Sequence, residues 1–197
     1  LDGRQREHVE AILDHATKME GVLQDLVDYA RLEQGRLGLE ERPFAPLEVL
    51  HACVAQQRTK GTAPTCPTQL SADGLAEVLV WGDRRRFAQV VAKLLGNAIG
   101  FSPGGAVELA AIWTAPKFAH GTGELRLRIK ESLPREGQRG QAELFPTFAA
   151  ARGTQGAAPG QAGLGLGLAY RLVRLMDGEI TVAGAAPGGV EFIVALP

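Results

Sequence analysis

The chain has 197 residues, of which 45% are hydrophobic and 22% charged, and its formal net charge is −1. These totals are typical of a soluble globular protein, and they argue against nucleic acid or a lipid surface as a partner held by bulk charge. The chain carries no membrane-length apolar run and no signal peptide, so we expect a cytoplasmic location and no direct membrane contact from this segment, with any membrane anchor lying upstream. Cys53 and Cys66 lack metal-ligand spacing and indicate a reduced compartment.

Residues 4–34 carry a heptad pattern of apolar side chains, which predicts one long helix. The pattern consists of Val9, Ile12, Ala16, Met19, Leu23, Leu26 and Ala30. At 1.5 Å per residue this helix is roughly 45 Å long, so it cannot bury its apolar stripe within a small domain. We therefore expect a homodimer through residues 4–34. His8 and His15 lie on this helix without a phosphoacceptor motif around them, and we interpret both as solvated residues.

The middle of the chain alternates short apolar runs with turn residues, as expected for a mixed helix and strand domain. The predicted elements are a connector at 35–46 with a short strand at 37–39, a helix at 47–58, a loop at 59–67, a strand at 77–81, and a helix from the N-cap Asp83 to about Gly100.

The last part of the chain predicts further strands around one glycine-led helix. The predicted elements are paired strands at 106–113 and 124–130, a long mobile loop at 133–163, a helix at 163–176, and strands at 179–183 and 190–196 joined by a turn at 187–189. Alternation of apolar and basic residues along 124–130 indicates one buried face and one wet face.

Residues 163–168 read Gly-Leu-Gly-Leu-Gly-Leu directly before an amphipathic run at 169–176. We interpret this as a loop that leads into a helix N-terminus, where backbone N–H groups and the helix dipole suit a phosphate. A flexible connecting loop without a ligand is the alternative, because a glycine motif alone is weak evidence.

Three stretches in order resemble the ATP-binding domain of sensor histidine kinases, in the superfamily shared with gyrase and Hsp90. They are Gly82 to Ser102, then Leu144-Phe145-Pro146-Thr147-Phe148, then Gly163 to Leu168 followed by Met176-Asp177-Gly178 and the final strand. The resemblance implies an α+β fold. A dimerisation and phosphotransfer helix at 1–36 would precede a catalytic domain at 37–197, built as an α/β sandwich with one mixed sheet and helices on one face.

The resemblance also implies roles at the matching positions. Asn97 corresponds to the asparagine that binds the Mg²⁺ bridging the ATP phosphates, and an amide oxygen suits this hard cation. Gly163, Gly165 and Gly167 correspond to the glycines beside the phosphates. Phe101 and Leu168 are placed at the nucleotide in the same way, and Phe145 and Phe148 match an aromatic pair at the base of a lid, with plain core packing as the alternative for that pair.

The sequence departs from the family pattern at the adenine end of the site. Glu131 stands where the family has the aspartate that accepts the adenine amino group, and Leu133 and Arg135 replace two glycines. Lys93 stands at a position that is asparagine or acidic in the family, where an acidic residue can assist as a base; a lysine ammonium has no lone pair to accept a proton. Gly100 stands where the family usually has a lysine, so one positive charge is absent at this position. These changes predict weakened or lost ATP binding.

Two classes of function follow from the resemblance. The first is the catalytic core of a bacterial two-component histidine kinase, which moves the ATP γ-phosphoryl group to a histidine upstream of this segment with the help of Mg²⁺. The alternative is a degenerate pseudokinase that regulates a partner kinase or a response regulator through protein contacts. A histidine phosphotransferase that kept the fold is a variant of the second class, and a gyrase- or Hsp90-like ATPase fits the long helix least well.

Overall fold

The computed structural model describes residues 2–59, 66–100, 102, 105–116, 122–132, 161–185 and 189–197. The chain divides into two compact units, Leu1–Gly38 and Leu39–Pro197. The division falls within two residues of the predicted boundary between residues 36 and 37.

The first unit is the helix α1, Gly3–Glu33, as the heptad pattern predicts. A capping box starts it: the Asp2 carboxylate accepts from the Gln5 N–H at 2.8 Å, and the Asp2 N–H donates to the Gln5 side chain at 3.1 Å. Gly35, at φ 61°, ends the helix in the left-handed conformation that glycine adopts without strain. The predicted start and stop are thus confirmed.

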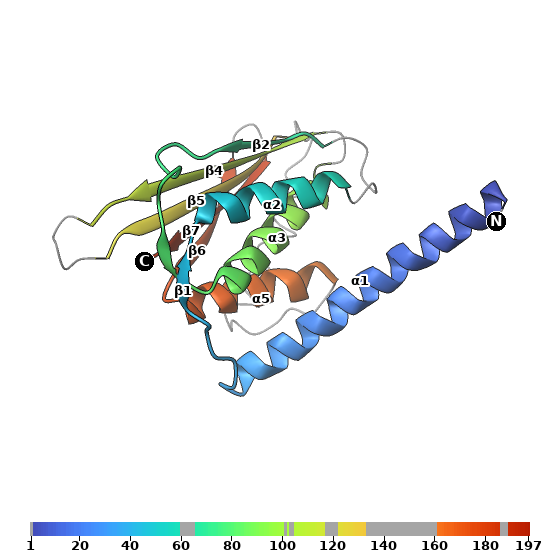
Figure 1. Ribbon diagram of the computed structural model, residues 1–197, viewed down its shortest axis with the longest axis horizontal. Coiled ribbons are helices and arrows are strands. Elements are labelled where there is room, and N and C mark those ends of the chain that lie inside the picture. Colours follow the sequence, from blue (N-terminus) through green and yellow to red (C-terminus); the bar gives the residue numbers. More distant parts are fainter. Residues whose placement is uncertain are drawn as a thin grey trace. The chain divides into compact units, whose positions relative to one another are not determined.

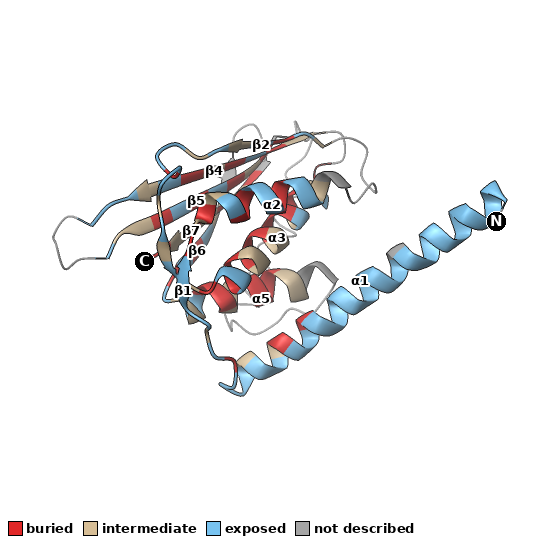
Figure 2. Cartoon of the chain, viewed as in Figure 1, coloured by how far each residue is buried: buried red, intermediate tan, exposed pale blue. Residues whose placement is uncertain are grey.

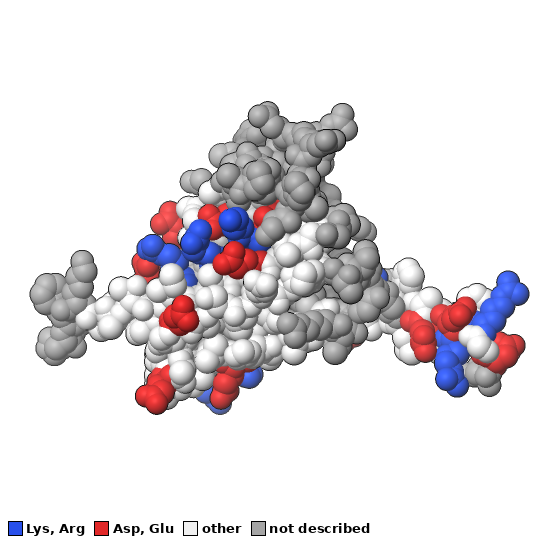
Figure 3. All heavy atoms as spheres, turned by 90° about the horizontal axis from the view of Figure 1, so that it is seen from above, with Lys and Arg blue, Asp and Glu red and all other residues white. Residues whose placement is uncertain are grey.

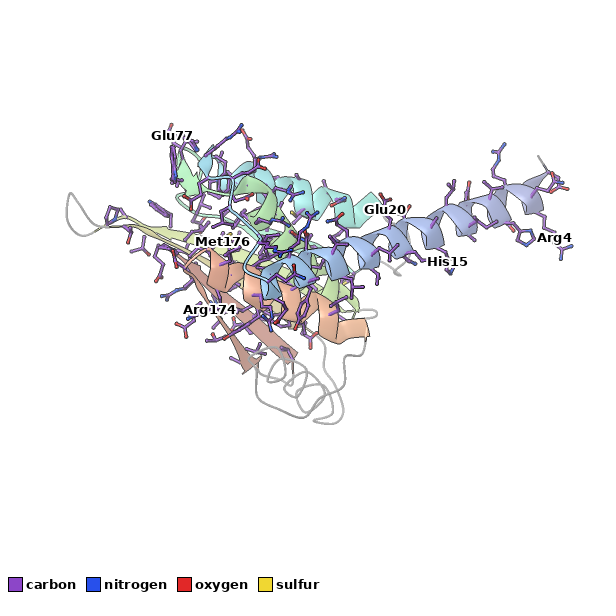
Figure 4. All side chains as sticks on the ribbon, turned by 90° about the horizontal axis from the view of Figure 1, so that it is seen from below. Arg4, His15, Glu20, Glu77, Arg174 and Met176 are labelled. Carbon is purple, nitrogen blue, oxygen red and sulfur yellow. The ribbon has the colours of Figure 1, made fainter. Side chains whose placement is uncertain are left out.

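The apolar stripe of α1 is exposed over its length, because α1 is the one helix among the described residues of its unit. Ile12 is 67% exposed and Met19 66%, and Figure 2 shows the helix in pale blue over nearly its whole length. His8 and His15 are exposed as well. His15 projects from α1 in Figure 4, and its Nδ1 lies 2.7 Å from the Ala11 carbonyl oxygen of the same helix.

The second unit is built on a five-stranded mixed sheet in the order β2-β4-β5-β7-β6. Its strands are β2 Thr68–Ser71, β4 Ala106–Thr114, β5 Glu124–Ser132, β6 Glu179–Ala185 and β7 Gly189–Leu196. β2 pairs with β4 in parallel, whereas the other three pairings are antiparallel. The predicted mixed sheet is confirmed.

Among the described residues, helices cover one face of this sheet (Figure 1). They are α2 Pro46–Thr59, α3 Arg84–Gly100 and α5 Gln161–Leu175. The strands turn alternate side chains toward the helices, as on β5, where Leu125, Leu127 and Ile129 are buried and Arg126 and Arg128 are exposed. This period of two puts the core between sheet and helices, so the predicted two-layer sandwich is confirmed.

Asp83 starts α3 as the sequence predicts. Its Oδ1 accepts from the Arg85 N–H at 2.9 Å and from the Arg86 N–H at 3.0 Å, so it satisfies two donors that a helix start leaves unpaired. Its Oδ2 accepts from the Glu40 N–H at 2.9 Å. One carboxylate therefore caps the helix and also fixes the segment that enters this unit.

The short strands differ from the sequence prediction. Residues 37–39 form no strand; the strand β1 is Arg42–Phe44 instead, and it pairs with β3, Val80–Gly82, in a separate two-stranded sheet. The strand predicted at 77–81 therefore starts later, and β2 was not predicted at all. Strands of three or four residues are too short for an alternation of apolar residues to reveal them.

The glycine run was expected as a loop that leads into a helix, and the loop is wrong, whereas the helix predicted at 163–176 is confirmed to within two residues. Residues 163–168 lie within α5, which starts at Gln161. At the other end of α5, the buried Gly178 cannot carry a side chain, because a Cβ there would stand 2.6 Å from the Ala195 carbonyl oxygen. Asp177 precedes it at φ 56°.

Charged side chains of both signs are interleaved on the face of the molecule in Figure 3. On the exposed side of the sheet, Arg128 donates two hydrogen bonds to Glu191 Oε1 on β7, at 2.8 and 2.6 Å. Arg126 pairs with Glu124 at 2.7 Å on its own strand. Much of the basic stripe on β5 is therefore matched by acidic neighbours.

Several predictions fall outside the described residues. They are Phe101, residues 133–160 of the long loop with Leu133, Arg135, Phe145 and Phe148, and most of the turn at 187–189. Within the described ranges, no helix combines the length and the apolar character that crossing a membrane requires.

Candidate nucleotide-binding site

The contact between α3 and α5 brings two of the predicted site segments together. Lys93 and Asn97 are one turn apart on α3, so they share one face of that helix, and both are half-buried. A Cβ atom placed on Gly165 of α5 would stand 3.7 Å from Lys93 Cδ. The Lys93 stem therefore lies against the glycine run near the start of α5.

Gly165 has no side chain to shield the backbone of the glycine run. Gly165 is half-buried, and the missing side chain leaves its main chain open on the side of Lys93. Gly167 and Leu168 lie deeper and are buried, Leu168 with 0% exposure. Leu168 thus takes part in core packing. Gly163 lies in the first turn of α5, where backbone N–H groups lack helical partners.

Glu131 lies at the end of β5, where the sequence comparison with the family places the base of the nucleotide. The residue is 3% exposed, and its Oε2 accepts a hydrogen bond from Ser102 Oγ at 3.2 Å. Ser102 is fully buried and follows the end of α3, with its own N–H donating to the Ile99 carbonyl. The pair therefore joins the end of α3 to the end of β5.

Cys66 lies close enough to Glu131 for the two to interact electrostatically. Burial raises the pKa of the Cys66 thiol above its ordinary range, and the nearby Glu131 carboxylate raises that pKa further. Cys66 reaches this place because β2 starts two residues later and pairs with β4, with Thr68 opposite Val107 and Val107 opposite Glu131. The thiol is kept protonated at neutral pH, which makes it a poor nucleophile.

The residues at the α3–α5 contact fit a polyphosphate with its metal. A lysine supplies a point charge for phosphate, and the helix start supplies N–H donors. The Asn97 side chain offers an amide oxygen, the type of ligand that Mg²⁺ accepts while keeping phosphate oxygens and waters. Among the described residues, no three His, Cys, Asp or Glu side chains form a metal cluster.

The structure thus brings Lys93 next to the glycine run, with Asn97 one turn further along α3 and Glu131 at the end of β5. Sequence reasoning did not predict the hydrogen bond from Ser102 to Glu131, although Ser102 is the last residue of the motif that starts at Gly82. It also missed Cys66. Both depend on contacts between segments distant in sequence, such as the 29-residue separation of Ser102 and Glu131, and no local pattern reports such a contact.

Comparison with known families gives a match over more than half of the chain. The family model described as "Histidine kinase-, DNA gyrase B-, and HSP90-like ATPase" matches residues 82–197. The match starts just before α3 and includes Lys93, Asn97, Glu131 and the glycine run.

The chain is also similar to two sensor kinases over nearly all its length. It is 27% identical to the autoinducer 2 sensor kinase/phosphatase LuxQ of Vibrio parahaemolyticus, over 98% of this chain and 22% of that protein. It is 29% identical to histidine protein kinase 1 of Candida albicans, over 100% of this chain and 8% of that protein. The chain therefore spans less than a quarter of each relative. One relative is from a bacterium and the other from a yeast, so the expected bacterial source is not decided.

Solved structures share the fold. The full-length ShkA structure in complex with AMPPNP superimposes with a TM-score of 0.65 at 24% identity, over 100% of this chain and 39% of that one. The Acinetobacter baumannii histidine kinase AdeS gives a TM-score of 0.67 at 19% identity, over 95% of this chain and 82% of that one. Both cover the long helix as well as the sandwich.

Proposed function

Because this chain belongs to the family of histidine kinase-, DNA gyrase B- and HSP90-like ATPases, we propose that Leu39–Pro197 binds ATP with Mg²⁺ and transfers its γ-phosphoryl group to a protein histidine N-terminal to this segment. The observation that supports the proposal is the packing of Lys93 against Gly165, near the start of a glycine-rich helix; Asn97, one turn along α3, is the proposed amide ligand. The ATP analogue in the ShkA structure supports the choice of nucleotide.

Each residue of the phosphate end has a defined task in this proposal. The N–H groups at the start of α5 bind phosphate oxygens, and Gly163 and Gly165 let them approach the backbone. Lys93 attracts the phosphates, and Asn97 orients the metal through its amide oxygen. Mg²⁺, when bound, neutralises charge on the β- and γ-phosphates. The chain itself thus acts by holding the γ-phosphoryl group in line for an incoming imidazole.

Lys93 does not act as the base in this proposal, since an ammonium group has no lone pair. An imidazole nitrogen attacks through its own lone pair, so the transfer needs a positioned nucleophile more than a strong base. A cation at this position stabilises negative charge on the phosphates instead.

In this proposal, recognition of the adenine base contributes less to nucleotide affinity than binding of the phosphates does. Ser102 Oγ donates to one oxygen of the Glu131 carboxylate, Oε2, at 3.2 Å, and the extra methylene of glutamate, compared with aspartate, displaces the carboxylate that would accept an adenine amino group. Loss of a charge-assisted hydrogen bond costs about 1.5–3 kcal/mol, or roughly 10- to 150-fold in affinity. We therefore propose nucleotide binding that rests mainly on the phosphates and is weaker than in family members with the aspartate.

The unit Leu1–Gly38 serves as the dimerisation helix in this proposal. Its exposed stripe, which includes Ile12, Met19 and Leu23, needs a partner helix. The pairing of two chains would bring the catalytic unit to a histidine of a helical bundle. A response regulator, or another kinase, is the proposed downstream partner, as expected for two-component signalling.

Calorimetric titration with a non-hydrolysable ATP analogue and Mg²⁺ tests this function. We expect saturable binding that Asn97→Ala weakens at least about tenfold, equivalent to roughly 1.4 kcal/mol. Thr181→Ala, on the exposed side of edge strand β6, is the matched control and should bind as the unmodified chain does. Folded protein that gives no heat up to millimolar nucleotide would contradict the kinase proposal and favour the non-catalytic alternative.

A further inference from the structure

The end of the sheet remote from Glu131 carries a hollow whose lining is partly apolar and partly polar. β5 runs from Glu124 to Ser132, so Leu125 and its partner Leu196 lie at the opposite end of the strand from Glu131. The hollow has a volume of about 110 Å³ and is lined by Phe44, Trp81, Leu125, Met176 and Leu196, with Phe87 beneath. We name it the Trp81 hollow; Figure 4 labels Met176, which follows α5.

The floor of the Trp81 hollow is fixed by packing in the core. The rings of Phe44 and Phe87 lie 5.4 Å apart, centre to centre, at an interplanar angle of 45°. Pairing of β1 with β3 puts Pro43 opposite Trp81 and Phe44 opposite Val80. The floor of the hollow is therefore held by contacts between β1, β3 and α3.

The rim of the hollow is apolar and exposed. Trp81 is 68% exposed, and Leu79, the second residue before it, is 67% exposed. Two large apolar side chains this close together on a surface are unfavourable in water and are characteristic of contact surfaces. Tryptophan is also the residue most enriched at the centres of protein interfaces.

The charged residues that line the hollow are acidic. Among the described lining residues, Glu41, Asp83 and Asp177 are acidic, and none is Lys or Arg. Asp83 is buried in its capping role, whereas Glu41 and Asp177 are exposed. Asp177 stands at the C-terminal end of α5, where the helix dipole disfavours a negative charge. The hollow thus combines an apolar floor with two exposed carboxylates.

We propose that the Trp81 hollow is a docking site for a protein segment that inserts one aliphatic side chain and presents a Lys or Arg beside it. A volume of about 110 Å³ is below the ~150 Å³ of a cavity that holds benzene, which favours a leucine- or methionine-sized group. The basic neighbour meets Glu41 and Asp177, and the Trp81 ring offers a cation–π contact. The site is separate from the nucleotide site and does not depend on the proposed kinase function.

Fluorescence titration can test this docking site directly. The chain has two tryptophans, so Trp113→Phe leaves Trp81 as the sole fluorescent reporter. The probes are three short synthetic peptides: one with a central Leu between lysines, its twin with glutamates in place of the lysines, and its twin with Ser in place of Leu. We expect saturable change in Trp81 emission with the Lys-flanked Leu peptide, and no saturation with either twin.

Variants then assign the binding to the proposed residues. Asp177→Asn combined with Glu41→Gln should weaken the Lys-flanked peptide about tenfold, and asparagine also tolerates the left-handed conformation of position 177. Calorimetry on Trp81→Ala should show binding lost, whereas Ile112→Ala, which removes an exposed apolar side chain on β4, should bind normally.

Three results would overturn the proposal. The first is equal binding of the Glu-flanked twin, which would remove the role of the carboxylates. The second is no saturation with any peptide at millimolar concentration. The third is a change in Trp81 emission with protein concentration alone, which would make a second copy of the chain the occupant. No nucleotide is present in any titration, so these results and the outcome of the ATP experiment are independent.

Discussion

Ser102 donates its hydroxyl hydrogen to the Glu131 carboxylate across 3.2 Å, and both residues are buried. This bond joins the end of α3, which carries Lys93 and Asn97, to the end of β5. Glu131, which departs from the family pattern, is therefore bonded to Ser102, the last residue of the Gly82–Ser102 stretch that matches this pattern. Glutamate has one methylene more than aspartate, and the Glu131 carboxylate reaches Ser102 across 3.2 Å.

Shortening this side chain should restore base recognition. Glu131→Asp is expected to raise affinity for the ATP analogue about tenfold, because the carboxylate no longer reaches Ser102 and returns toward the base. Loss of the buried bond should lower the free energy of unfolding by about 1–3 kcal/mol, measured by urea denaturation. Calorimetry measures the affinity. A fall in affinity would mean that the glutamate itself recognises the base.

Lys93 should control affinity for the phosphates. Lys93→Gln is expected to weaken binding of the triphosphate analogue about tenfold, whereas Lys93→Arg should retain most of it because the positive charge remains. Arg85→Gln removes an exposed cation from the first turn of the same helix and is the control. If Lys93→Gln and Arg85→Gln have the same small effect, the lysine acts only through general electrostatic attraction.

Asp83 should stabilise the second unit from two sides. Asp83→Ala removes the cap of α3 and the acceptor of the Glu40 N–H, and a helix cap alone is worth about 0.5–2 kcal/mol. Urea denaturation followed by circular dichroism should show a loss in or above this range. Asp73→Ala, which removes an exposed carboxylate at a position without positive φ, is expected to cost less than Asp83→Ala; the reverse order would argue against the capping role.

The pH dependence of the alkylation rate of Cys66 should depend on the negative charge of Glu131. Burial, and then the carboxylate, raise the Cys66 pKa, so the reactive thiolate is scarce at neutral pH and increases as pH rises toward that pKa. In a Cys53→Ala background, alkylation by iodoacetamide should be slow at neutral pH and faster in alkaline solution. Glu131→Gln removes the charge and lowers the Cys66 pKa, so alkylation at neutral pH should speed up.

The exposed Glu77→Gln serves as the matched charge control for this experiment, and it should leave the alkylation rate unchanged. An unchanged rate in Glu131→Gln would show that burial alone sets the reactivity of Cys66.

Long elements were predictable from the sequence because their signals are local. The heptad spacing over residues 4–34 predicts α1, Gly3–Glu33, to within one residue at each end. Asp83 predicts the start of α3. The alternation of apolar and basic residues from Leu125 to Lys130 predicts a strand with one solvent-exposed face. The ordered motifs identified the family, since each is a pattern along the chain and needs no contact to be recognised.

The tertiary structure decided what depends on contacts between distant segments. The strands β1, β2 and β3 are three or four residues long, so pairing rather than pattern defines them. The glycine run is helical because α5 packs on α3 and the sheet, which offsets the helix-breaking tendency of glycine. Only folding brought Ser102 and Cys66 to Glu131 and placed an exposed Trp81 over a partly apolar hollow, because a hydrogen bond or a cavity exists only where separate segments meet.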